Sequence, residues 1–118
     1  MCVGGYRLKL IFTKSYENSI KKIKKYTKEY NNLLDILDIL ESAESFDILI
    51  KLPILQLYNF ERLKYQFNEF YSFNLSRNGG LIRLIIKPKH NKVEVYIVYI
   101  SFDHYKDFIN KKVIIDDK

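Results

Sequence analysis

The stretch Val93–Ile100, VEVYIVYI, constrains the fold of this chain more than any other part of the sequence. Hydrophobic residues occupy its odd-numbered and its even-numbered positions alike. Successive side chains of a strand point to opposite faces of a sheet, so a strand with this pattern is buried on both faces. We therefore expect residues 93–100 to form a strand covered on each side by other parts of the chain.

Two more strands are predicted directly upstream, joined by a tight turn. Residues 70–76 alternate between hydrophobic and polar, which is typical of a half-buried strand. The pair Asn78-Gly79 tolerates the positive φ angles of a hairpin turn. Residues 81–87 form the second strand, in which Arg83 points away from the face formed by Ile82, Leu84 and Ile86. With a loop at KPKHNK, the C-terminal part becomes a three-stranded antiparallel meander.

The N-terminal part predicts a strand and two helices. Residues 6–13 alternate as a half-buried strand does, and Ser15 can cap the helix that follows. Its hydrophobic positions fall on one helical face as far as Tyr30, and Asn31-Asn32 then interrupts it. A second helix is expected at about 33–44. The first helix is basic and the second acidic, so the two can pair as a hairpin laid on the sheet. The predicted class is α+β, with the helical hairpin on one face of a small antiparallel sheet.

The segment 46–60, FDILIKLPILQLYNF, is hydrophobic with Pro53 in its middle. Proline argues against a continuous helix or a central strand. We expect a hydrophobic connection packed over the sheet edge. Two roles for it stay open: ordinary core, or a docking surface for another protein or a second copy of the chain.

Length and composition limit the class of protein. A chain of 118 residues with 47% hydrophobic residues is long enough for one folded domain, 1–118, and is not disordered. No run reaches the roughly 18 apolar residues that a membrane span needs, and the N-terminus lacks the features of a signal peptide. With a single cysteine, Cys2, an internal disulfide is excluded. We expect a cytoplasmic protein without a membrane partner.

The charges are segregated along the sequence. The net charge is +6, and residues 7–28 hold eight basic residues against one acidic residue. Residues 29–47 hold six acidic residues and no basic one, and 77–92 hold five basic residues and no acidic one. This pattern favours a basic face that meets a polyanion and a separate acidic face. A lysine-rich, well-solvated surface is the alternative explanation.

Four residues whose side chains can take part in catalysis are expected to lie close together in the fold. Arg83 lies in the middle of a hydrophobic strand, where burial without a partner would be costly. His104 and Tyr105 follow the last strand, and if the last two strands are neighbours this pair can reach toward Arg83. Glu61 precedes the meander. These residue types suit metal-free cleavage of RNA. A carboxylate can remove the 2′-hydroxyl proton, an arginine can stabilise the phosphorane, and a histidine can protonate the leaving 5′-oxygen. Tyrosine can stack on a base.

Each of these residues also has an ordinary structural explanation. An exposed Glu61 can simply be solvated, and Arg83 can be ion-paired at the surface. His104 can cap a helix end or bond to its neighbour Asp103, and Tyr105 can belong to the core. The two histidines and one cysteine lack the spacing of metal ligands, so we expect neither a metal nor another cofactor. There is no catalytic-triad pattern and no phosphate-binding glycine loop of the P-loop type.

Short spaced motifs resemble the RelE/ParE superfamily of toxins from toxin–antitoxin systems, and most of all its YoeB-like branch of ribosome-dependent mRNA endonucleases. The matching stretches are ERLK at 61–64, FYS at 70–72, IRLII at 82–86 and HY at 104–105. FTKSYENSIKKIKK also resembles the first strand and first helix of that superfamily. The resemblance covers about residues 6–108, and the tail 109–118 extends beyond it. It implies one RelE-like toxin domain.

What the resemblance implies for function is specific. Glu61 becomes the base, Arg83 the phosphate-stabilising residue, His104 the acid and Tyr105 the terminal aromatic residue. Lys64 would bind the RNA backbone, and Arg77 and Lys87 are further RNA-binding candidates. Members of the YoeB-like branch act on mRNA in the ribosome, need no metal and are inhibited by a cognate antitoxin. Toxin and antitoxin together repress their operon, so operator DNA is a partner of the complex only, and a homodimer is possible.

The sequence departs from the superfamily pattern at two places, and two other functions are compatible with it. Phe73 and Asn74 stand where the superfamily often has arginines, and the segment 46–60 is longer and more hydrophobic than expected. A ParE-like gyrase-inhibiting toxin would share the fold without cleaving RNA. A basic module that binds RNA or DNA without catalysis is the other alternative. The combination of Glu61, Arg83 and His104 favours the endoribonuclease, because a gyrase inhibitor has no need of an acid and a base.

Overall fold

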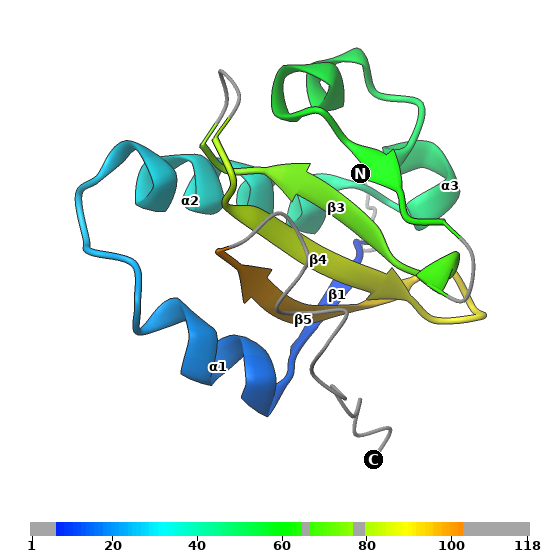
Figure 1. The fold of residues 1–118 in the computed structure, drawn as a ribbon. Coiled ribbons are helices and arrows are strands. Elements are labelled where there is room, and N and C mark those ends of the chain that lie inside the picture. The colour runs from blue at the N-terminus through cyan, green and yellow to red at the C-terminus, as the bar shows by residue number, and fades with distance from the viewer. Residues whose placement is uncertain (1–6, 65–66, 77–79, 103–118) are drawn as a thin grey trace.

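The protein folds around one five-stranded sheet, shown in Figure 1. The computed structural model describes residues 7–64, 67–76 and 80–102. The strands are β1 (Lys9–Phe12), β2 (Glu61–Arg62), β3 (Tyr71–Asn74), β4 (Arg83–Pro88) and β5 (Glu94–Ser101). Their order across the sheet is β1-β5-β4-β3-β2. The α+β class and the antiparallel meander β3–β4–β5 are confirmed.

The sheet is mixed, whereas the sequence predicted an antiparallel one. β1 pairs with β5 in parallel, with Lys9 opposite Glu94 and Phe12 opposite Ile97. A parallel pair requires a long crossover, and here all the intervening helices and strands provide it. β5 consequently lies between β1 and β4, and every one of its residues after Glu94 is buried. The expectation of a strand buried on both faces is confirmed.

Two hydrophobic cores lie on the two faces of the sheet. The larger one combines β4 and β5 with helix α2 (Lys28–Ser42), and α2 contributes Leu33, Ile36 and Leu40. The smaller one lies on the other face around Ile85, Tyr96, Val98, Tyr99 and Leu63. Ile85 and Ile86 fall in different cores, which is the alternation predicted for residues 81–87.

The helix boundaries differ from the predicted ones. Helix α1 spans Lys14–Ile20, and the Thr13 side chain accepts a hydrogen bond from the Tyr16 amide, so Thr13 and not Ser15 caps it. Thr27 caps α2 in the same way, and the predicted first helix to Tyr30 is therefore wrong. Asn31-Asn32 lies inside α2 instead of interrupting it. Asn32 Nδ2 donates to the Leu75 carbonyl at 2.7 Å, so its side chain does not compete with the helix backbone.

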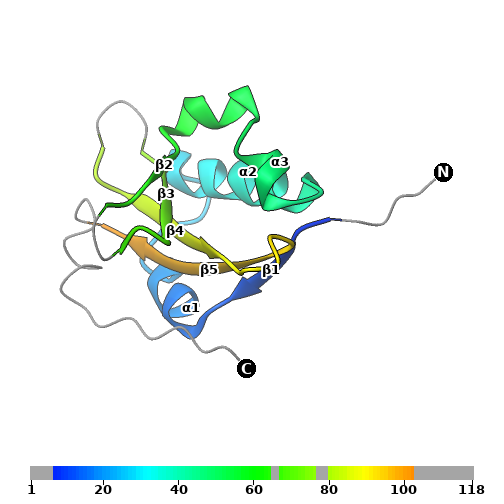
Figure 2. The same ribbon diagram turned by 90° about the vertical axis from the view of Figure 1, so that its right-hand side faces the viewer.

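The two helices do not pair as the predicted hairpin. Both contribute to the larger core, α1 through Tyr16 and α2 through Leu33. However, α1 packs along β5 where β1 has ended, whereas α2 contacts β1. Figure 2 shows α1 and α2 on different sides of the β1–β5 edge. The connection that separates them is rich in lysine and contains Tyr26 in a left-handed conformation, φ 70°.

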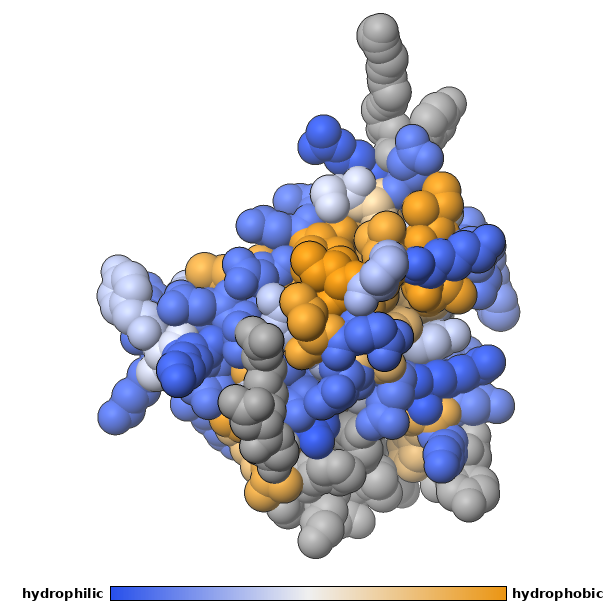
Figure 3. All heavy atoms as spheres, turned by 90° about the horizontal axis from the view of Figure 1, so that it is seen from above, coloured by the Kyte–Doolittle hydropathy of each residue, from blue (hydrophilic) through white to orange (hydrophobic). Residues whose placement is uncertain are grey.

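The segment 46–60 forms two short helices. Helix α3 spans Phe46–Leu49, and the 3-10 helix η1 spans Pro53–Tyr58 with Pro53 in its first turn, where a missing N–H costs nothing. Phe46, Leu49, Leu55 and Tyr58 are buried in the larger core. The same segment exposes an apolar patch, which we define as Ile48, Ile50, Ile54 and Leu57, each 42–54% exposed. Figure 3 shows hydrophobic side chains gathered on this face. The segment is therefore core on one side and apolar surface on the other.

The part of the chain that the structure describes contains no helix long and apolar enough to cross a membrane.

Candidate active site

Glu61 and Arg83 lie on the same face of the sheet. Glu61 of β2 is opposite Ser72 of β3, and Arg83 of β4 is opposite Asn74 of β3. Ser72 and Asn74 are two residues apart in one strand, so their side chains point to the same face. Two strand spacings across and one two-residue step along the sheet put the Cα atoms of Glu61 and Arg83 about 12 Å apart. Two long side chains can approach one phosphate group from that separation.

The Arg83 side chain is anchored at the start of β4. Its Nη1 donates to the Gly80 carbonyl at 2.6 Å and lies 3.5 Å from the Ile82 carbonyl. The residue is half-buried. These contacts hold the guanidinium at the end of the sheet where the β3–β4 connection returns, and a guanidinium fixed in this way loses little rotamer entropy when it binds an anion.

The end of β5 lies beside Arg83. Ser101, the last residue of β5, is opposite Arg83 in the antiparallel register. The sequence-based prediction that the end of one strand meets the start of the other is thereby confirmed. His104 and Tyr105 follow β5 but lie outside the described residues, as does Arg77, and their positions stay predictions.

The face that carries Glu61 and Arg83 is not an open polar groove over its whole length. Its centre is the smaller hydrophobic core, against which Phe67 and Phe70 pack from the segment that follows β2. Polar residues on this face include Glu61 and Ser72, and at the Arg83 end Asn74 and Ser101 flank Arg83 in the register. Asn74 and Ser101 are buried and both have hydrogen-bonding partners. The polar groups of this face therefore lie around a hydrophobic centre and do not form one continuous groove.

The two other described candidates, Lys64 and Lys87, lie away from Arg83. Lys64 is exposed just after β2. Lys87 is four residues along β4 from Arg83, about 13 Å at the rise of a strand. Its Nζ lies 3.5 Å from Glu69 and 5.7 Å from the centre of the Phe70 ring. Lys87 therefore does not lie beside Arg83.

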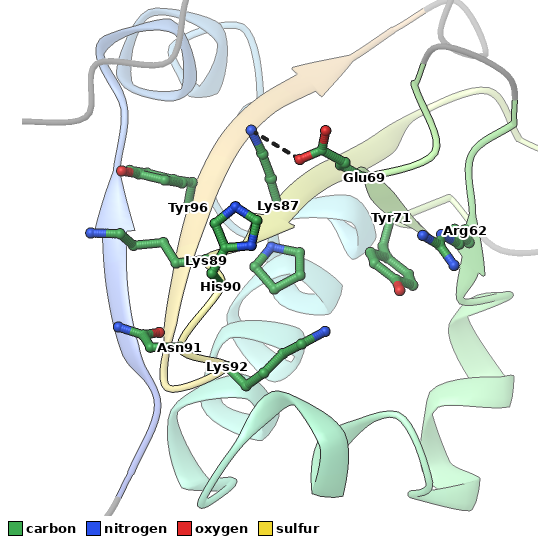
Figure 4. Close-up of a pocket in the computed structure, with 10 residues that line it drawn as sticks. Arg62, Glu69, Tyr71, Lys87, Lys89, His90, Asn91, Lys92 and Tyr96 are labelled. Carbon is green, nitrogen blue, oxygen red and sulfur yellow. Dashed lines mark ion pairs between the residues drawn. The ribbon is translucent and has the colours of Figure 1, made fainter.

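A basic pocket at the other end of the sheet was missed by the sequence analysis. It has a volume of about 480 Å³ and lies where β4 ends and β5 begins, as Figure 4 shows. Ten residues line it: Arg62, Glu69, Tyr71, Lys87, Pro88, Lys89, His90, Asn91, Lys92 and Tyr96. The dense basic loop KPKHNK was the available signal. Arg62 comes from a distant strand, and no spacing in the sequence indicates that it joins this loop.

In the described part of the chain, no three histidine, cysteine, aspartate or glutamate side chains lie close enough together to hold a metal ion. The chemistry available at the Glu61–Arg83 end is that of a carboxylate, a guanidinium and hydroxyl and amide groups. Such groups serve proton transfer and the stabilisation of an anion.

Comparison with known proteins shows the fold. No protein-family model and no curated protein matches the sequence. Among solved structures, a YoeB/ParE toxin from Agrobacterium tumefaciens is similar at 14% identity and a TM-score of 0.58, over 80% of this chain and 98% of the toxin. A mutant of YafQ from E. coli is similar at 14% identity and a TM-score of 0.59, over 88% of this chain and 99% of YafQ.

An archaeal toxin has the same fold. In the RelE–RelB complex from Pyrococcus horikoshii, the matched chain is 15% identical with a TM-score of 0.54, over 84% of this chain and 97% of that one. Coverage of nearly the whole length of each of these structures means that the likeness extends over the complete fold. The chain therefore has the RelE/ParE-type toxin fold, and the resemblance seen in its short motifs is confirmed at the level of the fold.

Proposed function

We propose that this chain is the toxin of a type II toxin–antitoxin system and that it cleaves mRNA on the ribosome. The observation that carries the proposal is the placement of Glu61 and Arg83 on one face of a sheet that has the RelE/ParE-type toxin fold. The sequence motifs around these two residues match that superfamily as well. A carboxylate and a guanidinium about 12 Å apart by Cα suit a phosphodiester bound between them.

In the proposed reaction, phosphorus forms a bond to the 2′-oxygen and loses its bond to the 5′-oxygen. Glu61 takes the proton of the 2′-hydroxyl, and the 2′-oxygen forms a bond to the adjacent phosphorus. Arg83 stabilises the negative charge on the phosphorane oxygens. The bond from phosphorus to the 5′-oxygen breaks, and His104 donates a proton to that oxygen. The products are a 2′,3′-cyclic phosphate and a free 5′-hydroxyl, and no redox partner or metal takes part in the step.

Support for the acid comes from the strand register. Ser101 is opposite Arg83, and only Phe102 and Asp103 separate it from His104 in the sequence. An extended chain covers at most about 3.6 Å per residue, so the Cα atom of His104 lies within about 11 Å of that of Ser101. This limit is compatible with the proposed role of His104 at a phosphate held at Arg83.

A cognate antitoxin is the proposed protein partner. One of the structures with this fold is a RelE–RelB complex. The apolar patch Ile48, Ile50, Ile54 and Leu57 is a candidate contact surface for it, because apolar side chains on neighbouring turns are a common feature of protein interfaces.

Induced expression followed by primer extension on cellular mRNA tests the function. The expected result is growth arrest with discrete cuts inside translated codons, and cut fragments that carry a 5′-hydroxyl. A Glu41→Gln chain, altered at an exposed carboxylate of α2, should cut like the unaltered chain. Growth arrest without cuts, together with broken DNA at gyrase sites, would instead favour the gyrase-inhibiting alternative. If the chain causes neither growth arrest nor cuts, the alternative that remains is nucleic-acid binding without catalysis.

A further inference from the structure

The basic pocket at the β4–β5 turn is a second site, at the end of β4 opposite to Arg83, and Arg62 of its lining follows Glu61 in β2. We propose that it holds a phosphate group of single-stranded RNA. The inference rests on the proposed function only in its choice of RNA as the polyanion. The pocket is separated from Arg83 by the length of β4, about 13 to 17 Å. It therefore binds a different phosphate from the one that reacts.

The lining carries an excess of positive charge. Four permanent cations, Arg62, Lys87, Lys89 and Lys92, line the pocket together with a single carboxylate, Glu69. Glu69 is paired with Lys87, and Lys89 is paired with Glu94 at 3.4 Å, outside the lining. Arg62 and Lys92 form no ion pair with the described residues. These two cations supply the charge that a phosphate would neutralise.

The wall formed by the β4–β5 turn is rigid. Asn91 Oδ1 accepts hydrogen bonds from the Val93 and Glu94 amides, and Asn91 Nδ2 donates to Glu94 Oε1 at 2.8 Å. The Lys92 carbonyl accepts from the Phe46 amide at 2.7 Å, which ties the turn to the start of α3. Lys92 is held in a left-handed conformation, φ 63°. A fixed backbone means that only the lysine stem has to become ordered when an anion binds.

The opposite wall presents a guanidinium that is already oriented. Arg62 Nε donates to the Asn68 carbonyl, and its guanidinium carbon lies 5.8 Å from the centre of the Tyr71 ring. This leaves the terminal nitrogens without a partner among the described residues. Two parallel N–H groups of a fixed guanidinium match the oxygens of a phosphate. Figure 4 shows Arg62 beside Tyr71 on one side of the pocket and Lys89 and His90 on the other, with the Lys92 side chain extending from the turn toward Arg62.

The aromatic rings of the pocket are already packed, and this favours a phosphate over a base as the bound group. The Tyr71 ring stacks on Phe60 with centroids 5.3 Å apart and also contacts Phe46 and Arg62. Lys89 lies 5.7 Å from the centre of the Tyr96 ring. A stacked base would have to displace these groups. The pocket therefore recognises the backbone of a strand and not its sequence.

Continuity with the candidate active site favours a polynucleotide strand over a free nucleotide. Arg62 follows Glu61 in β2, and Lys87 shares β4 with Arg83. The two sites are thus linked through β2 and β4, with the smaller hydrophobic core between them. An RNA strand bound at Arg83 would meet the pocket about two to three nucleotides away, and the two contacts would reinforce each other because they belong to one molecule.

Fluorescence anisotropy with a labelled eight-nucleotide oligouridine tests the inference on the full chain. The double variant Arg62→Gln/Lys92→Gln removes two charges while keeping most of each side chain's length. The control Lys25→Gln/Lys51→Gln removes the same charge from exposed positions elsewhere. We expect the pocket variant to bind about tenfold more weakly and its salt slope to fall by about 0.7 for the lost phosphate contact. The control should keep most of the affinity.

Three outcomes overturn the inference, and they are distinguishable from a failure of the proposed function. Equal binding by the pocket variant and the control removes the pocket as an RNA site. Tight, pocket-dependent binding of free uridine monophosphate or inorganic phosphate, without added affinity for the oligomer, identifies a small-molecule site instead. Absence of RNA binding by the unaltered chain removes any RNA site. Cleavage is measured separately, and an unaltered chain that binds through the pocket without cutting would refute the function and leave this inference standing.

Discussion

Ser19 of α1 completes the hydrogen bonding of β5 at the point where β1 has ended. Its Oγ accepts from the Ile100 amide at 3.0 Å and donates to the Tyr16 carbonyl at 2.9 Å. Thr13 has a similar role, since its Oγ1 donates to the Val98 carbonyl at 2.7 Å. The two hydroxyl groups bond to backbone groups of β5 that a longer β1 would otherwise pair with. Replacing Ser19 with alanine should therefore leave a buried backbone N–H without a partner.

The expected cost follows from burial. Ser19 is 4% exposed and Ile100 is fully buried, so water cannot replace the lost acceptor. A buried donor left unsatisfied costs about 1–3 kcal/mol. Alanine favours the helix over serine by up to about 0.5 kcal/mol. The free energy of unfolding should fall by about 1.5 kcal/mol, which is the cost of the unsatisfied donor less the gain in the helix. That is a substantial share of the roughly 5–15 kcal/mol that stabilises a domain.

Urea unfolding followed by circular dichroism measures this change, with an unchanged m-value as evidence that only stability is affected. Ser42→Ala is the matched control. Ser42 ends α2, is exposed, and donates from Oγ to the carbonyl three residues earlier at 3.0 Å, as Ser19 does. It has no bond to the sheet. If Ser19→Ala costs no more than Ser42→Ala, then Ser19 does not complete the edge of β5 and the reasoning is refuted.

Three further predictions concern titration and the surface. Burial raises the pKa of Tyr16 to about 12. The folded state therefore keeps the tyrosine proton that the unfolded state releases near pH 10. The free energy of unfolding consequently falls by about 1–2 kcal/mol between pH 10 and 12. Tyr16→Phe should remove that part of the alkaline loss in pH-dependent unfolding, and an unchanged profile would contradict it. The hydrogen bond from Asn91, and then the charge of Lys89, hold the pKa of Glu94 below its usual value; Asn91→Ala should raise it in an NMR titration, and no rise would remove Asn91 as the main cause. Leu57→Asp should weaken binding to the antitoxin in calorimetry while leaving the melting temperature almost unchanged, because Leu57 is 54% exposed; undiminished binding would exclude the patch as the contact.

The sequence was sufficient for β5 and the meander because their signals are local. Hydrophobic residues at both odd and even positions of 93–100 require cover on both faces, whatever surrounds them. The alternation around Arg83 likewise fixed its face relative to Leu84. The parallel pairing of β1 with β5 could not be predicted in this way, because it joins segments at opposite ends of the chain.

The errors have physical causes that are visible in the structure. Asn31-Asn32 looked like a helix break because asparagine competes for backbone hydrogen bonds, but Asn32 bonds to the Leu75 carbonyl instead. Thr27 is an equally good capping residue, and its side chain caps α2, which begins at Lys28. For the candidate site, the register places Glu61 and Arg83 on one face, which the sequence alone does not specify, and Lys87 belongs to the pocket at the far end of β4.

The central claim is that Glu61 and Arg83 act on one phosphodiester. The initial rate of mRNA cleavage on ribosomes, compared between Glu61→Gln and Glu41→Gln chains at equal occupancy, tests it most directly. We expect a loss of about 100-fold or more for Glu61→Gln, because the general base is removed, and no loss for Glu41→Gln. Equal rates for the two chains would exclude Glu61 as the base that acts on the phosphodiester.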